Sequence, residues 1–135
     1  MTGIVHTIVG ACVGSFFKNR AGAFAAGLAS HVVLDAIPHK DFGPALEIPL
    51  AAGALAGIAG WRGVISPEFV GAMGGLCPDI EHGLGMVGIL TEEQRAFPTH
   101  IFDGKYHAPE SDERLSQLLI AAAALAVIAL NTRRE

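Results

Sequence analysis

The sequence predicts an all-α fold, an integral-membrane helical bundle of four to five short spans that forms one domain over residues 1–135. Three observations predict it. Hydrophobic residues make up 51% of the chain and charged residues only 16%, against roughly 25% in soluble domains. Apolar stretches of helix length recur along the chain, with polar breaks between them. Glycine pairs spaced four apart allow helices to pack closely in lipid: Gly10/Gly14, Gly53/Gly57 and Gly71/Gly75.

The apolar stretches define the predicted elements in order. They cover residues 2–17, 21–37, 45–61, 64–90 and 115–130. The first break is Lys18-Asn19-Arg20, and the second is the loop 38–44, which has a proline at each end. Trp61-Arg62-Gly63 ends the third stretch and is typical of an interfacial turn. A polar loop at about 91–114 carries much of the remaining charge before the last stretch.

The fourth stretch, 64–90, leaves two arrangements open. The other four stretches are all shorter than the roughly 20 residues that a straight span needs, whereas this one is long enough. It is interrupted by Pro67 and Pro78, however, and it contains Asp79 and His82. It therefore either crosses the membrane or re-enters it, which is tolerated only where the backbone is buried in protein or lines a wet cavity.

The charges exclude one class of partner and suggest an orientation. A net charge of −4 is unlike the basic surface of a nucleic-acid-binding protein. With five spans, one side of the membrane would carry Lys18, Arg20, Arg62, Arg133 and Arg134. The positive-inside rule makes that side cytoplasmic, so the N-terminus is expected outside and the C-terminus inside.

Histidine and aspartate within the apolar stretches form the candidate site, because an ionisable residue at membrane depth is a functional hypothesis by default. His31 and Asp35 are spaced i,i+4 and share a helix face, which suits two ligands of a divalent metal. A structural hydrogen bond without metal is the alternative. His39 continues the stripe about 12 Å further on if the helix is straight. It therefore serves the same ion only if Pro38 breaks the helix, and otherwise a second ion or the substrate.

The remaining candidates come from three other segments. Asp79 and His82 are spaced i,i+3 after a proline, where Asp79 alternatively caps a restarted helix. In the predicted orientation every candidate lies at the outer end of the bundle. Asp35 and Asp79 are the candidate catalytic residues, since a carboxylate can bridge two ions. The predicted metal ligands are His6, His31, Asp35, His39, Asp79, His82 and His100.

Four motifs carry a resemblance to a known family. They are His6-Thr7 before Gly10, Ser30-His31-xxx-Asp35, Gly75-x-x-Pro78-Asp79-x-Glu81-His82, and Thr99-His100. Together they resemble small prokaryotic multi-span proteins classed as membrane-bound metal-dependent hydrolases. These include the LexA-binding, inner-membrane-associated hydrolases and are similar in pattern to zinc-dependent phospholipase C. The Pro-Asp segment here follows the Ser-His-xxx-Asp helix, whereas it is expected before that helix in the better-known branch.

The resemblance implies a membrane-bound hydrolase in a prokaryotic inner membrane, with one or two divalent ions, zinc being the expected metal. The expected substrate is a phosphoester or another ester, including lipid-like ones, reached at the outer interface. Membrane lipid and a second copy of the chain are the expected partners. Two alternatives stay open. One is a small transporter that handles ions or protons along a wet cavity. The other is a non-catalytic membrane scaffold with structural histidines.

Overall fold

The computed structural model describes residues 1–97, 108, 109, 111 and 114–131, and within them the chain is all-helical, without a β-strand. Its elements are α1 (Gly3–Gly14), α2 (Arg20–Asp35), α3 (Pro44–Arg62), α4 (Pro67–Met86), the short 3-10 helix η1 (Glu92–Gln94) and α5 (Leu115–Asn131). The predicted all-α fold is therefore confirmed for the described part of the chain.

Polar side chains cap the starts of two helices. Asn19 precedes α2, and its side chain accepts a backbone N–H from the first turn; Ser66 does the same for α4. Gly63 ends α3 with φ at 89°, a conformation that favours glycine. Pro78 does not break α4, which runs on to Met86. Asp79 is consequently a residue of the helix interior and not an N-cap.

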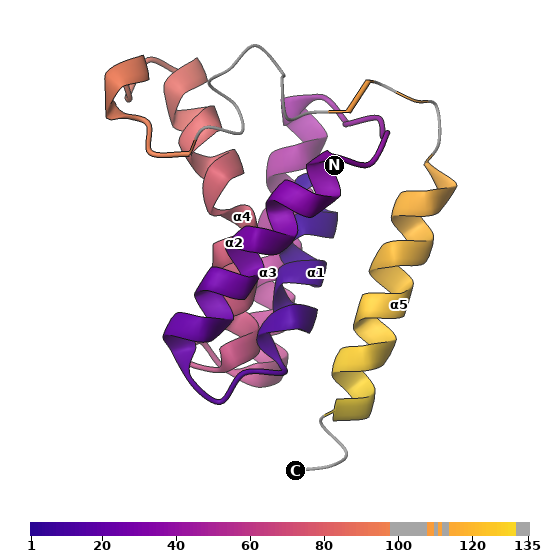
Figure 1. Ribbon diagram of the computed structural model, residues 1–135. Coiled ribbons are helices and arrows are strands. Elements are labelled where there is room, and N and C mark those ends of the chain that lie inside the picture. The colour runs from indigo at the N-terminus through magenta and orange to yellow at the C-terminus, as the bar shows by residue number, and fades with distance from the viewer. Residues whose placement is uncertain (98–107, 110, 112–113, 132–135) are drawn as a thin grey trace.

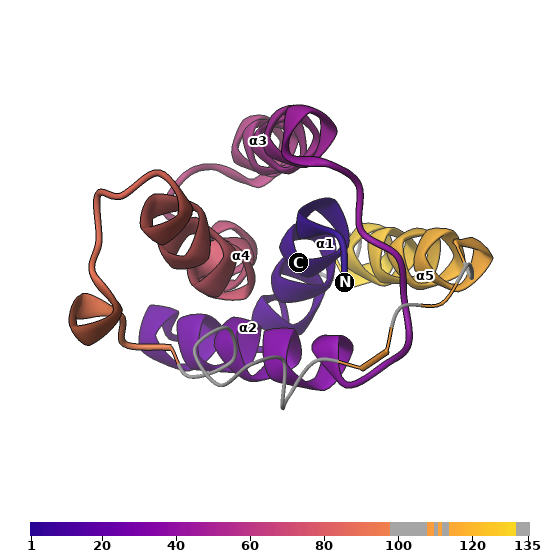
Figure 2. The same ribbon diagram turned by 90° about the horizontal axis from the view of Figure 1, so that it is seen from above.

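Helix α1 lies in the middle of the bundle, with α2, α3, α4 and α5 around it (Figure 2). The most extensive contacts join α1 and α2 to α4. Within the described residues, the one extensive helix contact of α5 is with α1. Successive helices run in opposite directions (Figure 1). The α1–α2 and α3–α4 connections therefore share one end of the bundle, and the start of α1 and the α2–α3 connection share the other.

Glycines let α1, α2 and α4 meet backbone to backbone. A Cβ atom on Gly10 would lie 2.5 Å from the carbonyl oxygen of Gly71, and a Cβ on Gly14 would lie 2.5 Å from that of Pro67. A Cβ on Gly27 of α2 would overlap the same Gly71 carbonyl. We call this three-helix contact the glycine seam. The predicted pairs Gly10/Gly14 and Gly71/Gly75 belong to it. Around Gly53 and Gly57, in contrast, no described atom beyond the adjacent turns of α3 lies within 4 Å of a Cβ position.

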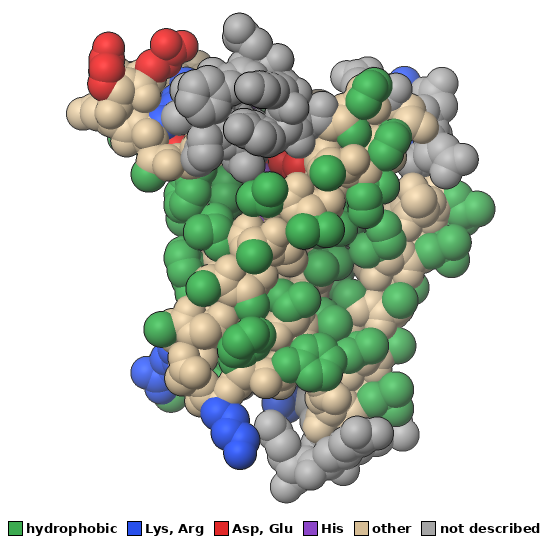
Figure 3. All heavy atoms as spheres, in the orientation of Figure 1, with side chains coloured by type: hydrophobic (Ala, Val, Ile, Leu, Met, Phe, Trp, Pro, Cys, Tyr) green, Lys and Arg blue, Asp and Glu red, His purple; other side chains and the backbone are tan. Residues whose placement is uncertain are grey.

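The face of the bundle seen in Figure 3 is largely apolar, with charges near its two ends. Large hydrophobic side chains are exposed on α2, α3, α4 and α5. Among the described residues, α3 is the one helix long and apolar enough to cross a membrane unaided, and it is mostly exposed. The prediction of a helical bundle is thus confirmed, whereas its four to five membrane spans stay a prediction. The reason is that α1 and α5 are apolar but short, with 12 and 17 residues, and α2 and α4 carry polar site residues.

At the end of the bundle opposite the N-terminus, Arg62 pairs with Glu68, which is only 3% exposed. Arg62 Nε donates to Glu68 Oε1 at 2.9 Å, and Nη2 lies 2.7 Å from the same oxygen. Replacing Glu68 by Gln should lower the free energy of unfolding by about 1–3 kcal/mol, because it removes charge-assisted bonds to a partly buried arginine. Thermal unfolding followed by circular dichroism tests this. The exposed Glu92→Gln is the control, and an equal midpoint in both variants would contradict the prediction.

Candidate metal centre

His31 and Asp35 lie one turn apart near the end of α2, and both are buried, at 0% and 1% exposure. Their predicted common face is confirmed, since His31 Nε2 lies 3.1 Å from Asp35 Oδ2. The other ring nitrogen, Nδ1, lies 2.8 Å from the carbonyl oxygen of Gly75. A carbonyl can only accept, so Nδ1 is the donor, and this bond fixes the ring with Nε2 turned toward the acidic residues.

His6 reaches the same place from α1. Its ring stacks on that of His31, with the centroids 3.9 Å apart and the planes at 23°. His6 is 0% exposed, and its Nε2 lies 2.9 Å from Asp35 Oδ1. Among the described residues Nδ1 of His6 has no hydrogen-bond partner, although it is buried. Such a buried orphan nitrogen calls for an explanation, and an ion or a water is a common one.

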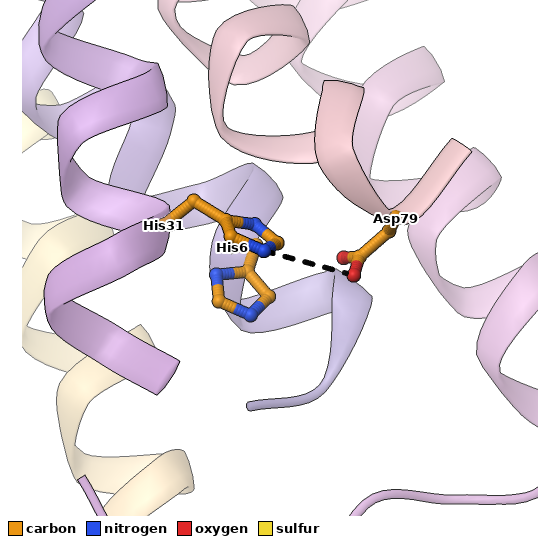
Figure 4. A group of neighbouring side chains, drawn as sticks. All are labelled: His6, His31 and Asp79. Atoms are coloured by element: carbon orange, nitrogen blue, oxygen red, sulfur yellow. Dashed lines mark ion pairs between the residues drawn. The ribbon is translucent and has the colours of Figure 1, made fainter. Parts of the chain in front are cut away.

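Asp79 completes the group from α4. It is half-buried, and its Oδ1 lies 3.9 Å from His31 Nε2 (Figure 4). One ligand atom from each of His6, His31 and Asp79 lies within 4.8 Å of the other two. We call these three residues the ligand group. Two imidazoles and a carboxylate at this separation could hold one metal ion.

The glycine seam brings the three helices of the ligand group together. Gly75 packs against the backbone carbonyl of His6, where a Cβ atom would overlap the oxygen. The same glycine offers its own carbonyl to His31. One residue of α4 thus fixes the positions of both histidine-bearing helices, and Asp79 follows it one turn later on the same helix.

Asp35 links the two histidines and the start of the chain. Its Oδ1 accepts a hydrogen bond of 2.6 Å from the Met1 amino group, in addition to its contact with His6. Its Oδ2 contacts His31. Asp35 Oδ1 thus serves the Met1 amino group and His6, while Oδ2 lies beside His31 Nε2, next to the ligand group.

The other predicted ligands are arranged differently. His39 is buried next to the site, but its Nδ1 bonds the Ile37 carbonyl at 2.6 Å and its Nε2 lies 3.3 Å from Asp41 Oδ1. His82 is half-buried on α4, one turn beyond Asp79, and is not part of the ligand group. His100 lies outside the described residues. The predicted gathering at one end therefore holds for His6, His31, Asp35, His39, Asp79 and His82.

Two residues of this end were not predicted from the sequence. Glu47 of α3 accepts backbone N–H groups from Gly3 and Phe42, both at 2.8 Å. Gln117 of α5 is 5% exposed, accepts from the Thr2 hydroxyl at 2.9 Å, and donates to the Lys40 carbonyl at 2.9 Å. A signal for both exists in the sequence, because each is a polar residue inside an otherwise apolar stretch.

Comparison of the chain with family models, with curated proteins and with solved structures gives no match.

Proposed function

We propose that this chain is a membrane-embedded, metal-dependent hydrolase that cleaves a phosphoester or another ester at the membrane interface. One observation carries the proposal. Two histidines and two aspartates from three helices converge at one end of a bundle that exposes large hydrophobic side chains on α2, α3, α4 and α5. Buried ionisable groups that gather in this way are expensive to maintain, which favours a functional role.

The donor set suits a catalytic metal. Three protein ligands that leave a further position open are typical of catalytic zinc, and His6, His31 and Asp79 supply two nitrogens and one oxygen. The orphan Nδ1 of His6 fits the same reading, because a metal ligand accounts for a buried nitrogen with no partner. We therefore propose zinc or a similar divalent ion. A second ion, bridged by Asp35 or Asp79, belongs to the same proposal.

The residues of the site would have different roles in the proposed reaction. A bound divalent ion supplies a Lewis acid and makes a water nucleophilic near neutral pH. His31 is oriented by the Gly75 carbonyl, and a histidine fixed in this way is a stronger and better-directed ligand. Asp35 would hold the His6 ring through Oδ1 and keep negative charge beside both histidines. Full burial of His6 and His31 excludes bulk water from their side of the centre.

The proposed membrane position rests on the distribution of charge. Lys18, Arg20 and Arg62 lie at the connections opposite the ligand group, whereas the basic residues of the α2–α3 and α4–α5 connections are mixed with acidic ones. Under the positive-inside rule the ligand group would face outward and the C-terminus inward, in a prokaryotic inner membrane. Lipid would then surround the apolar surface, and the exposed face of α3 could contact a second copy. A site at the outer interface suits a lipid-like or other amphiphilic ester.

Metal analysis of the purified protein is the first test. In detergent, we expect at least about one equivalent of divalent metal per chain and hydrolysis of phosphoesters or carboxyl esters. A chelator should abolish the hydrolysis and lower the unfolding temperature, because an ion that binds only the folded state stabilises it. Re-addition of zinc should restore both. Absence of metal, even after re-addition, would refute the hydrolase and favour structural histidines or transport. Bound metal without ester cleavage would favour a scaffold.

A further inference from the structure

We propose that Glu47 is a positioning residue of the metal centre, which holds α1 in register and keeps a negative charge next to Asp79. This inference rests on the proposed function. Glu47 is the single acidic residue of α3, a mostly exposed helix whose other charged residue is Arg62 at its far end. Its carboxylate contacts two other segments of the chain. One is the start of α1, the helix that carries His6, and the other is the segment that follows His39.

The contacts of Glu47 join three elements. Oε2 accepts the N–H of Gly3, in the first turn of α1, at 2.8 Å. Oε1 accepts the N–H of Phe42, in the segment that follows His39, at 2.8 Å. Both oxygens are thus bonded to backbone, and a carboxylate with two N–H donors is firmly held. Glu47 thereby clamps the start of α1 and the α2–α3 connection to α3.

Helix α1 depends on this contact because it lacks a cap of its own. Thr2 occupies the N-cap position but makes no capping bond, since its hydroxyl donates to Gln117. The first N–H groups of a helix need an acceptor from elsewhere, and a negative charge there also interacts favourably with the helix dipole. Glu47 supplies both. Gly3 lies one turn before His6 on the same side of α1, so the clamp sets where the His6 ring lies.

Glu47 also lies close to Asp79. A Cβ atom on Gly3 would lie 3.4 Å from Glu47 Oε2 and 3.6 Å from Asp79 Oδ2, so the two carboxylates flank the same point beside Gly3. Two carboxylates repel each other when no cation is near and favour a cation between or beside them. Removal of the Glu47 charge should therefore weaken the attraction of the site for a divalent ion, in addition to loosening α1.

Cobalt binding tests the role of Glu47, because Co²⁺ reports coordination through its visible spectrum. The probe is Co²⁺ alone, titrated into the metal-free, detergent-solubilised full chain. We expect Glu47→Gln to weaken Co²⁺ binding about 10-fold or more, as changes next to metal ligands usually do, and to alter the spectrum of the bound ion. Glu68→Gln is the matched control. It removes a buried carboxylate at the opposite end of the bundle, so it should lower stability but leave both the Co²⁺ affinity and the spectrum unchanged.

The possible outcomes separate the two proposals. Unchanged affinity and spectrum in Glu47→Gln, while the wild type binds Co²⁺, would overturn the role of Glu47 and leave the metal centre standing. No Co²⁺ binding in the wild type would overturn both. If Glu47→Gln does not fold, Glu47→Asp replaces it. Aspartate keeps the charge but is too short to hold both N–H groups, so weaker binding is still expected, and unchanged binding would overturn the inference.

Discussion

Replacing Gly27 by alanine is expected to destabilise the protein more than any other single methyl addition to α2. A Cβ atom there would overlap the carbonyl oxygen of Gly71, and it would lie 2.9 Å from the carbonyl carbon and 3.0 Å from the Gly75 nitrogen. All three atoms are backbone, so α2 and α4 must separate to make room. Overpacking of a core usually costs about 1–3 kcal/mol, and a backbone clash belongs at or above the upper end.

The measurement compares thermal unfolding of Gly27→Ala with that of Gly57→Ala, in the same detergent. Gly57 also lies within an α-helix, but no described atom beyond the adjacent turns of its own helix is within 4 Å of its Cβ position. In a helix, alanine is favoured over glycine by about 1 kcal/mol, so Gly57→Ala should be neutral or stabilising. Equal midpoints for the two variants would mean that the glycine seam does not hold the bundle together.

Loss of bound metal in His31→Ala is the second large effect that we expect. The Nε2 atom of His31 belongs to the ligand group, and its ring packs on that of His6 and contacts Asp35. Removing a ligand should weaken metal binding by more than the roughly 10–100-fold typical of residues that only support a ligand. Asp79→Ala should do the same. Hydrolysis, if the proposed function is right, should be lost with the metal.

The control for this pair is His82→Ala. His82 is a half-buried histidine on α4, one turn beyond Asp79, and it does not belong to the ligand group. Elemental analysis of the three variants, with circular dichroism to verify that each is folded, gives the comparison. Metal retained in folded His31→Ala, or lost equally in His82→Ala, would show that the ligand group is assigned wrongly.

The stability and metal predictions are coupled through Gly75. This residue belongs to the glycine seam, and its carbonyl accepts the bond from His31 Nδ1. If the seam opens in Gly27→Ala, that acceptor moves relative to α2. We therefore expect Gly27→Ala to bind metal more weakly even at temperatures where it remains folded, whereas Gly57→Ala should bind it normally.

The local features of the fold could be read from the sequence. Hydropathy located the helices, and the polar break at Asn19 turned out to be the cap of α2. The cap of α4, Ser66, lay inside the predicted apolar stretch 64–90. The spacing of His31 and Asp35 alone was enough to put them on one face of α2, because an α-helix repeats every 3.6 residues. Antiparallel succession of the helices also brought His6 and Asp79 to the same end of the bundle.

The choice among the candidates was decided by the tertiary structure. Seven residues were predicted as ligands, and helix periodicity cannot say which residues of different helices face one another. That depends on how each helix is rotated and how closely it approaches its neighbours. Here the seam at Gly71 and Gly75 sets both, so His6, His31 and Asp79 meet while His39 turns to Asp41. The sequence determined the helices and the polar residues that each one carries. The backbone contact of three helices determined which of those residues meet in the site. A glycine permits such a contact only where another backbone lies against it, and the sequence does not say where that is.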